Sequence, residues 1–107
     1  MEKAEVLYHG SPVRLHTLRK DSTVTPYRHL ARVFAHKPTI VSIDDLERIK
    51  HNGVRPGYLY VIDEPLARED LRQHPTSVLP EGWELLANRD LRVRMVARVR
   101  LREAERL

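Results

Sequence analysis

The sequence predicts a single α+β domain built from mainly antiparallel strands with one or two short helices. The clearest sign is residues 91–102, where every odd position is apolar and every even position except Val96 is arginine. A period of two over this length predicts a long strand with one face on the core, and such a strand needs antiparallel or mixed partners. Residues 57–62 (GYLYVI) are rich in aromatic and branched side chains, which predicts a buried strand. A chain of 107 residues has the length of one domain, here residues 1–107.

The N-terminal third predicts two further short strands. Residues 5–9 (EVLYH) are mostly apolar and end at the turn-forming triplet Gly10-Ser11-Pro12. Residues 32–35 (RVFA) are the second predicted strand. The stretch between them is polar and rich in turn formers, so the sequence assigns it no element.

Two segments carry helix signals. Ser42 is followed three residues later by Asp45, a pattern typical of an N-cap, and predicts a helix over residues 42–52. Residues 67–74 predict a second, shorter helix. Three apolar side chains would share one face of the first helix: Ile43, Leu46 and Ile49.

The composition excludes several kinds of site. The chain has no cysteine, which removes disulfides, thiolate-bound zinc, iron–sulfur clusters and cysteine nucleophiles, and fits a reducing compartment. Its apolar runs are far shorter than the ~20 residues that span a bilayer, and its first residues lack the apolar stretch of a signal peptide. We therefore expect a cytoplasmic protein without a membrane partner.

Arginine dominates the basic residues, and the formal net charge is +4. Because the guanidinium group binds phosphate or carboxylate through two donors, an anionic partner is one interpretation, and a solvated arginine-rich surface is the other. The same alternatives hold for the predicted strand at residues 91–102, whose arginines either follow a nucleic-acid backbone or keep a solvent face charged. A charged solvent face is the favoured interpretation, because that face has no aromatic residue to stack on bases. The nucleic-acid contacts would be Arg92, Arg94, Arg98 and Arg100.

Single motifs for catalysis are sparse. The sequence has no Walker-type loop, no GxGxxG and no HExxH. Its six histidines have no ligand-like spacing, so the sequence predicts no metal site. His9 lies two residues from Ser11, but the intervening Gly10 and the following Pro12 favour the end of a strand there, which gives a serine hydrolase little support.

An ordered set of short segments resembles the ADP-ribosyltransferase-like fold. The set consists of Tyr8-His9-Gly10-Ser11, Val33-Phe34-Ala35, residues 57–62, and Trp83-Glu84-Leu85-Leu86 leading into Leu91-Arg92-Val93. Order and spacing are similar to the diphtheria-toxin and poly(ADP-ribose) polymerase branch, especially to small bacterial members such as rifampin ADP-ribosyltransferase. The resemblance covers about residues 6–101 and implies two small packed, mainly antiparallel sheets. No single segment is specific, and the ordered set carries the resemblance.

The resemblance implies roles for individual residues. His9 and Gly10 would hold NAD, with the histidine donating to the adenosine-side ribose and the glycine backbone pairing with the nicotinamide amide. Ser11 would lie near a ribose. Glu84 matches the family's glutamate, which stabilises the positive charge that develops on the ribose as nicotinamide leaves.

The sequence also departs from the family pattern. The family often has a tyrosine that stacks on nicotinamide, but the corresponding residues 42–44 hold no aromatic. Phe34, Tyr27 or Tyr58 would have to replace it. Asp63 and Glu64 are spare candidates for the role of Glu84.

The preferred functional prediction is NAD-dependent transfer of ADP-ribose to an unknown acceptor, which is a protein, a nucleic acid or a small molecule. The first alternative is a non-catalytic NAD- or nucleotide-binding module of the same fold. The second is a basic RNA-binding or RNA-processing protein, because the fold also includes a tRNA 2′-phosphotransferase that uses NAD. Catalysis would fall to Glu84 and His9, and cofactor binding to His9, Gly10, Ser11, Phe34 and Tyr58.

Overall fold

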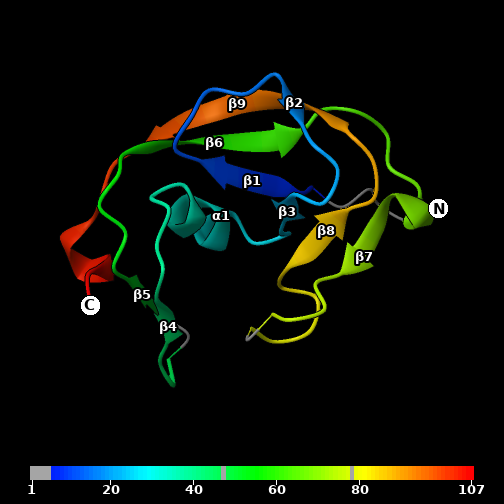
Figure 1. Cartoon of the computed structure of the whole chain (residues 1–107). Coiled ribbons are helices and arrows are strands. Elements are labelled where there is room, and N and C mark those ends of the chain that lie inside the picture. Colours follow the sequence, from blue (N-terminus) through cyan, green and yellow to red (C-terminus); the bar gives the residue numbers. More distant parts are fainter. Residues whose placement is uncertain (1–5, 47, 78) are drawn as a thin grey trace.

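A computed structural model describes residues 6–46, 48–77 and 79–107, and its largest element is a four-stranded sheet in the order β1-β6-β9-β2. A three-stranded sheet (β3-β8-β7) and a two-stranded hairpin (β4-β5) lie below it in Figure 1, with the helix α1 between the four-stranded sheet and the hairpin. All strand pairs within these sheets are antiparallel. The strands are β1 (Tyr8–Ser11), β2 (Thr17–Leu18), β3 (Thr23–Val24), β4 (Val41–Ile43), β5 (Ile49–His51), β6 (Gly57–Ile62), β7 (Leu71–Gln73), β8 (Leu85–Ala87) and β9 (Leu91–Val99).

The two strongest sequence patterns form the centre of the large sheet. The strands predicted at residues 57–62 and 91–102 are confirmed as β6 and β9, although β9 ends at Val99. Their pairing is interrupted once, because Leu59 lies opposite Ala97 and Tyr60 lies opposite Met95. The extra residue in this β-bulge is Val96, the one even position of the alternation that is not arginine.

The bulge lets β9 contribute to two separate clusters of buried residues. Leu91 and Val93 pack with Tyr60, whereas Val99 packs with Leu59. Leu59 and Tyr60 are neighbours in a regular strand and therefore face opposite sides of the sheet. The expectation that one face of the whole strand lies on the core is wrong, since the apolar positions change sides at Val96.

The bulge also divides the arginines of β9. Arg94 lies opposite Val61 and Arg98 lies opposite Tyr58. Cross-strand neighbours share a face, and Val61 and Tyr58 are an odd number of residues apart, so the two exposed arginines project to opposite sides. The sequence therefore predicted a continuous arginine face that the fold does not form. A nucleic-acid partner remains a prediction without such a face to support it.

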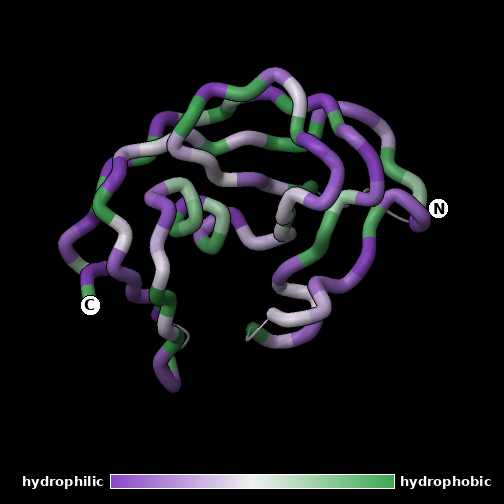
Figure 2. Tube along the Cα trace, viewed as in Figure 1, coloured by the Kyte–Doolittle hydropathy of each residue, from purple (hydrophilic) through white to green (hydrophobic). Residues whose placement is uncertain are grey.

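The segment predicted as a strand at residues 32–35 is instead the end of a helix, α1 (Arg28–Phe34). The strand prediction was wrong because the apolar residues follow a helical period over a longer stretch. Leu30 and Val33 pack toward the β4–β5 hairpin, and Ala31 and Ala35 toward the large sheet. Figure 2 shows hydrophobic stretches along α1 beneath the sheet.

Two glycines let α1 approach the sheet closely. A Cβ atom built on Gly10 would lie 1.8 Å from the carbonyl oxygen of Ala31, and one on Gly57 would lie 2.3 Å from that of Ala35. No side chain fits at these distances, so Gly10 and Gly57 set the depth at which the helix packs.

The helix predicted at residues 42–52 is wrong, because the described part of this segment forms the β4–β5 hairpin. Ile43 pairs with Ile49 across the hairpin, and Leu46 is exposed at its turn. The Asp44 carboxylate accepts hydrogen bonds from the backbone N–H groups of Leu46 and Arg48 and from the Arg48 side chain. An aspartate that bonds its own following backbone favours a turn over a helix.

The remaining elements complete an α+β arrangement. The helix predicted at residues 67–74 is only a 3₁₀ turn, Arg68–Asp70, followed by β7, and a second 3₁₀ turn covers Glu103–Glu105. Of the strand predicted at residues 5–9, Glu5 lies outside the described residues, and β1 extends beyond the predicted end to Ser11. Among the residues that the structure describes, no helix has the length and apolar character needed to cross a membrane.

Candidate functional site

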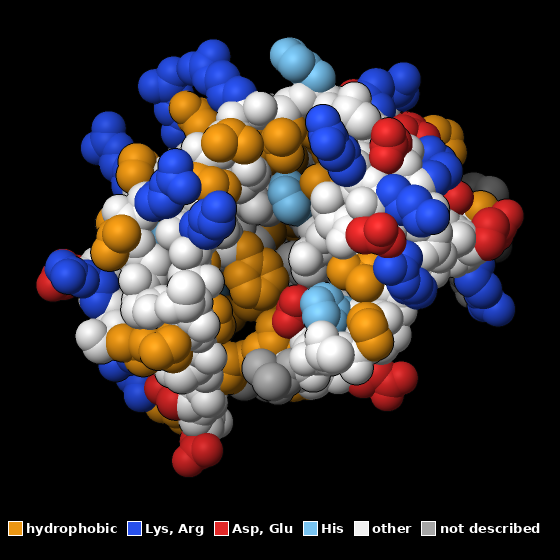
Figure 3. Space-filling view, viewed as in Figure 1, with side chains coloured by type: hydrophobic (Ala, Val, Ile, Leu, Met, Phe, Trp, Pro, Cys, Tyr) orange, Lys and Arg blue, Asp and Glu red, His pale blue; other side chains and the backbone are white. Residues whose placement is uncertain are grey.

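A pocket of about 350 Å³ opens between β1, the end of α1 and the start of β8. This volume lies at the lower end of the range of roughly 300–1,000 Å³ found for small-molecule sites. Figure 3 shows a hollow on this face with a hydrophobic floor and with acidic and histidine side chains at its rim. The lining residues are His9, Gly10, Ser11, Pro12, Thr23, Phe34, Lys37, Pro38 and Glu84.

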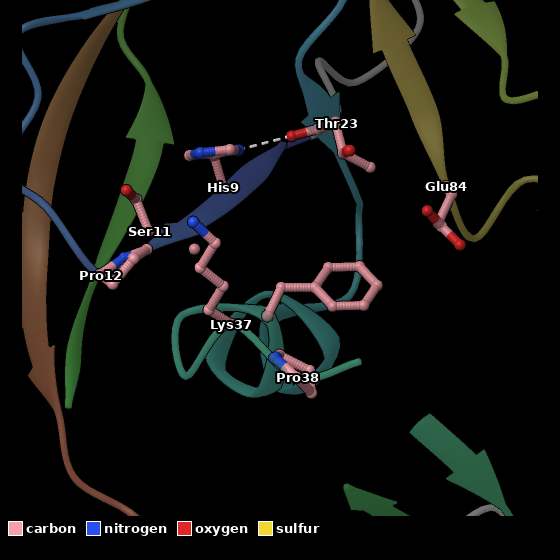
Figure 4. A pocket seen from close by; sticks show the side chains of 9 residues that line it. His9, Ser11, Pro12, Thr23, Lys37, Pro38 and Glu84 are labelled. Atoms are coloured by element: carbon pink, nitrogen blue, oxygen red, sulfur yellow. Dashed lines mark hydrogen bonds between the residues drawn. The ribbon is translucent and has the colours of Figure 1, made fainter. Parts of the chain in front are cut away.

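His9 is held in one tautomer by its neighbour on β3. Its Nδ1 lies 2.6 Å from the carbonyl oxygen of Thr23 (Figure 4). A carbonyl only accepts, so Nδ1 carries the proton and the Nε2 atom of the neutral ring is an acceptor. Burial lowers the pKa of His9, which keeps the ring neutral at pH 7. The donor role expected from the sequence is therefore reversed, and a ribose hydroxyl would donate to His9.

Gly10 presents its peptide groups at the free edge of β1. Two residues earlier, Tyr8 exchanges two hydrogen bonds with Thr25, at 2.8 and 2.9 Å, and so points its N–H and C=O away from β6. Peptide groups alternate sides along a strand, and those of Gly10 point to the same edge. This edge offers one donor and one acceptor to a ligand, the pair that a planar carboxamide needs.

Ser11 closes β1 and is buried. Its Oγ accepts a hydrogen bond of 3.2 Å from the backbone N–H of Val13, which stabilises the turn after the strand. In Figure 4 its side chain lies on the same side of the pocket as Lys37. The hydroxyl hydrogen is still free to be donated to a ligand oxygen.

The end of α1 supplies an aromatic ring and a cation. Phe34 is the last residue of the helix and lines the pocket. Three residues later Lys37 has a backbone φ of 52°, in the left-handed region. This conformation costs about 1 kcal/mol for a residue with a Cβ atom. Lys37 is the single lysine or arginine among the described lining residues, which makes it the candidate partner for an anionic group.

Glu84 lies across the pocket from His9 and Lys37 in Figure 4. It immediately precedes β8, whose antiparallel pairing with β3 brings it to the pocket. The Ser77 hydroxyl donates to its Oε1 at 2.7 Å, and His74 Nε2 lies 4.0 Å from its Oε2. The carboxylate is thus oriented by its own loop, and Oε2 remains able to accept from a ligand.

Several predicted residues lie elsewhere. Tyr58 is not among the residues that line the pocket, and the guanidinium of Arg14 stacks over its ring at 5.6 Å. The ring of Tyr27 lies 4.9 Å from that of Trp83. Of the three aromatic candidates, only Phe34 lines the pocket.

The spare acidic candidates belong to a surface network at the end of β6. Glu64 accepts from Arg89 Nη1 at 2.7 Å and from the backbone N–H of Arg92, and the Asp63 carbonyl accepts from Arg92 Nε. Hydrogen bonds from the Arg92 backbone N–H and then from Arg89 lower the pKa of Glu64, and a hydrogen bond from Arg89 lowers that of Asp70. Neither Asp63 nor Glu64 lines the pocket, so Glu84 is the one acidic residue that the described lining contains.

Sequence reasoning missed Lys37 and Thr23. The pair Lys37-Pro38 follows Phe34 closely, so the α1 segment itself carried a signal that a cation lies near the predicted site. Thr23 gave no such signal, because its contact with His9 depends on β3 packing beside β1.

Comparison with known proteins adds no identification. No family model, no curated protein and no solved structure matches this chain significantly.

Proposed function

We propose that this protein binds NAD in the pocket and transfers its ADP-ribose to an acceptor, releasing nicotinamide. One observation carries the proposal. A single pocket is lined by residues from three separate segments of the resemblance, namely His9, Gly10, Ser11, Phe34 and Glu84. Chance matches to short motifs have no physical reason to converge in space, whereas the parts of one binding site must.

The chemistry of the lining fits the nicotinamide end of NAD. The free N–H and C=O of Gly10 match the acceptor and donor of a carboxamide, and Phe34 offers an aromatic face for the ring. His9 Nε2 accepts from a ribose hydroxyl, and Lys37 neutralises phosphate. The pocket volume suits a nicotinamide riboside unit, so the adenosine half would extend over the open rim.

The proposed reaction breaks the bond between ribose C1′ and the nicotinamide nitrogen. The bonding electrons go to nicotinamide, which leaves as a neutral molecule, and positive charge develops on the ribose. The Glu84 carboxylate stabilises that charge. The acceptor forms the new bond to C1′ and gives up a proton, so atoms and charge balance. Water in place of the acceptor gives simple NAD hydrolysis.

The first test is calorimetric titration with NAD. Wild-type protein should bind NAD with constant affinity from pH 8 to pH 7. Burial lowers the pKa of His9, so the protein's affinity for NAD should fall only after the pH drops below the usual histidine pKa of about 6.5. Protonation then converts Nε2 from an acceptor into a donor. His9→Ala should bind NAD weakly and with no such pH dependence.

The matched control is His16→Ala, which changes an exposed histidine outside the pocket. It should bind NAD as the wild type does. An absence of heat from folded wild-type protein at millimolar NAD would contradict both the transferase and the non-catalytic binding module. Binding of RNA instead would favour the RNA-processing alternative.

A second test separates the phosphate contact from the nicotinamide contact. Lys37→Met removes the cation and should weaken NAD binding roughly tenfold, a typical effect of losing one charge-assisted hydrogen bond. Its affinity for free nicotinamide, measured in the same calorimeter, should not change. Lys20→Met, at an exposed lysine outside the pocket lining, is the control. Equal losses for both ligands would place Lys37 in the fold rather than at the phosphate.

A further inference from the structure

A second cluster of polar side chains is buried on the side of α1 that faces β5. His36 follows the C-terminal end of α1, His51 ends β5, and Glu105 ends the last 3₁₀ turn. All three residues are buried, and one ligand-type atom from each lies within 4.8 Å of the others. Because their positions in the sequence are far apart, no spacing in the sequence indicated the cluster.

His36 has a nitrogen without a partner. Its Nδ1 lies 2.7 Å from the carbonyl oxygen of Arg55, and since a carbonyl only accepts, Nδ1 carries the proton. The Nε2 lone pair is therefore unprotonated, and this buried atom has no hydrogen-bond partner among the described residues. A buried acceptor without a partner is rare in folded proteins and needs an explanation.

The other two residues complete a set of donors. Glu105 Oε1 accepts from Arg32 Nη1 at 2.8 Å, which leaves Oε2 facing His51 Nε2 at a long 3.4 Å. The two imidazole rings lie parallel, with their centroids 5.3 Å apart. Gly53 packs against both histidines, and a Cβ there would lie 2.8 Å from the Cβ of His36.

We propose that His36, His51 and Glu105 bind a divalent transition-metal ion of the zinc type. Two imidazoles and one carboxylate are a donor set that zinc takes in proteins. The hydrogen bond from His36 Nδ1 to a backbone carbonyl is the outer contact that orients metal-bound histidines, and Arg32 holds the second oxygen of Glu105 in the same way. The ion binds the lone pair of His36 Nε2, which otherwise has no partner among the described residues.

Metal binding requires one proton rearrangement. Gly53 N–H donates to His51 Nδ1 at 3.0 Å, so the neutral ring carries its proton on Nε2. Coordination through Nε2 moves that proton to Nδ1 and breaks the hydrogen bond from Gly53. Ligands must lose competing protons whenever a protein binds a metal, and the ion–nitrogen bond offsets this cost.

The ion would connect the C-terminal segment to the back of the candidate site. His36 is adjacent to Lys37 in the chain, and the backbone N–H of Leu107 donates to the carbonyl of His51. A bound ion therefore fixes the segment that carries Lys37 and Pro38. The metal proposal does not depend on NAD binding.

The test uses the full-length protein, stripped with a chelator and titrated with Zn²⁺. One ion should bind per chain, and Co²⁺ should give the visible absorption of a low-symmetry site with nitrogen and oxygen ligands. With free Zn²⁺ at a hundred times its Kd, the Tm should rise by about 10–20 °C. Glu105→Gln keeps the size of the side chain and an acceptor for Arg32, and should weaken Zn²⁺ binding roughly a hundredfold or more.

His36→Gln should have the same effect, and His16→Ala, at an exposed histidine, should bind Zn²⁺ as the wild type does. If His36→Gln fails to fold, Glu105→Gln decides the question alone. Absence of binding to the wild type would overturn the proposal. Binding that Glu105→Gln leaves unchanged would also overturn it, because the ion would then lie at the surface.

Discussion

Replacing Glu84 with glutamine should lower nicotinamide release by roughly a hundredfold or more while NAD affinity stays within a few-fold of wild type. The reason is that the carboxylate opposes a positive charge that exists only as the bond to nicotinamide breaks. An interaction made mainly in the transition state is lost from turnover and not from ground-state binding. Glutamine keeps the size of the side chain and can still accept from Ser77, so the loop before β8 should keep its conformation.

Nicotinamide release is measured by chromatography, with NAD alone and again with a cell extract as the source of acceptor. Glu81→Gln is the matched control, because Glu81 is an exposed acid on the same loop and does not line the pocket. It should release nicotinamide at the wild-type rate. Equal rates for wild type and Glu84→Gln would assign Glu84 to structure. If the wild type binds NAD but releases no nicotinamide even with extract, the protein is the non-catalytic module.

The two central strands of the four-stranded sheet, β6 and β9, could be predicted because their signal is local. A period-two pattern in β9 and a run of branched and aromatic residues in β6 specify strands before any tertiary contact forms. The bulge was visible only as Val96, an irregularity whose meaning depends on the partner strand. The sequence could not show that the arginines of β9 separate onto two sides, because faces are set by pairing and not by order along the chain.

The helix at Arg28–Phe34 was missed because tertiary packing decides it. The segment has no acidic residue in its first turn and no side-chain cap at Tyr27, so the usual start signals are absent. Its stability comes from burying Leu30 and Val33 on one side and Ala31 on the other. The β4–β5 hairpin was missed for the opposite reason. A capping signal predicted a helix there, but Asp44 uses its side chain to close a turn.

Five of the six site residues expected from the family resemblance line one pocket, and Tyr58 does not. Their role in binding stays a prediction. Lys37 and Thr23 had to be found in space. The buried cluster of His36, His51 and Glu105 likewise has no trace in spacing, because three separate elements supply it.

The second large effect is a loss of stability expected when Gly10 is substituted, because this residue both faces the pocket and packs against α1. The free peptide edge of Gly10 would serve the ligand, but its missing side chain serves the helix, because a Cβ would lie 1.8 Å from the Ala31 carbonyl oxygen and 2.7 Å from the Ala35 backbone nitrogen. Both are backbone atoms of α1 or its cap and cannot rotate away. Gly10→Ala should therefore lower the free energy of unfolding by about 3 kcal/mol or more, at or above the upper end for overpacking.

For a domain of this size such a loss lowers the Tm by about 12–24 °C, measured by thermal unfolding followed by circular dichroism. Gly82→Ala is the comparison, because Gly82 has a φ of 83° and open space around it. That substitution meets only backbone strain of about 1 kcal/mol, or roughly 4–8 °C. Gly57→Ala should behave like Gly10→Ala, since its Cβ would lie 2.3 Å from the Ala35 carbonyl oxygen. If Gly10→Ala were as stable as the wild type, α1 would not pack against β1 at this depth, and the lower wall of the pocket would be placed differently.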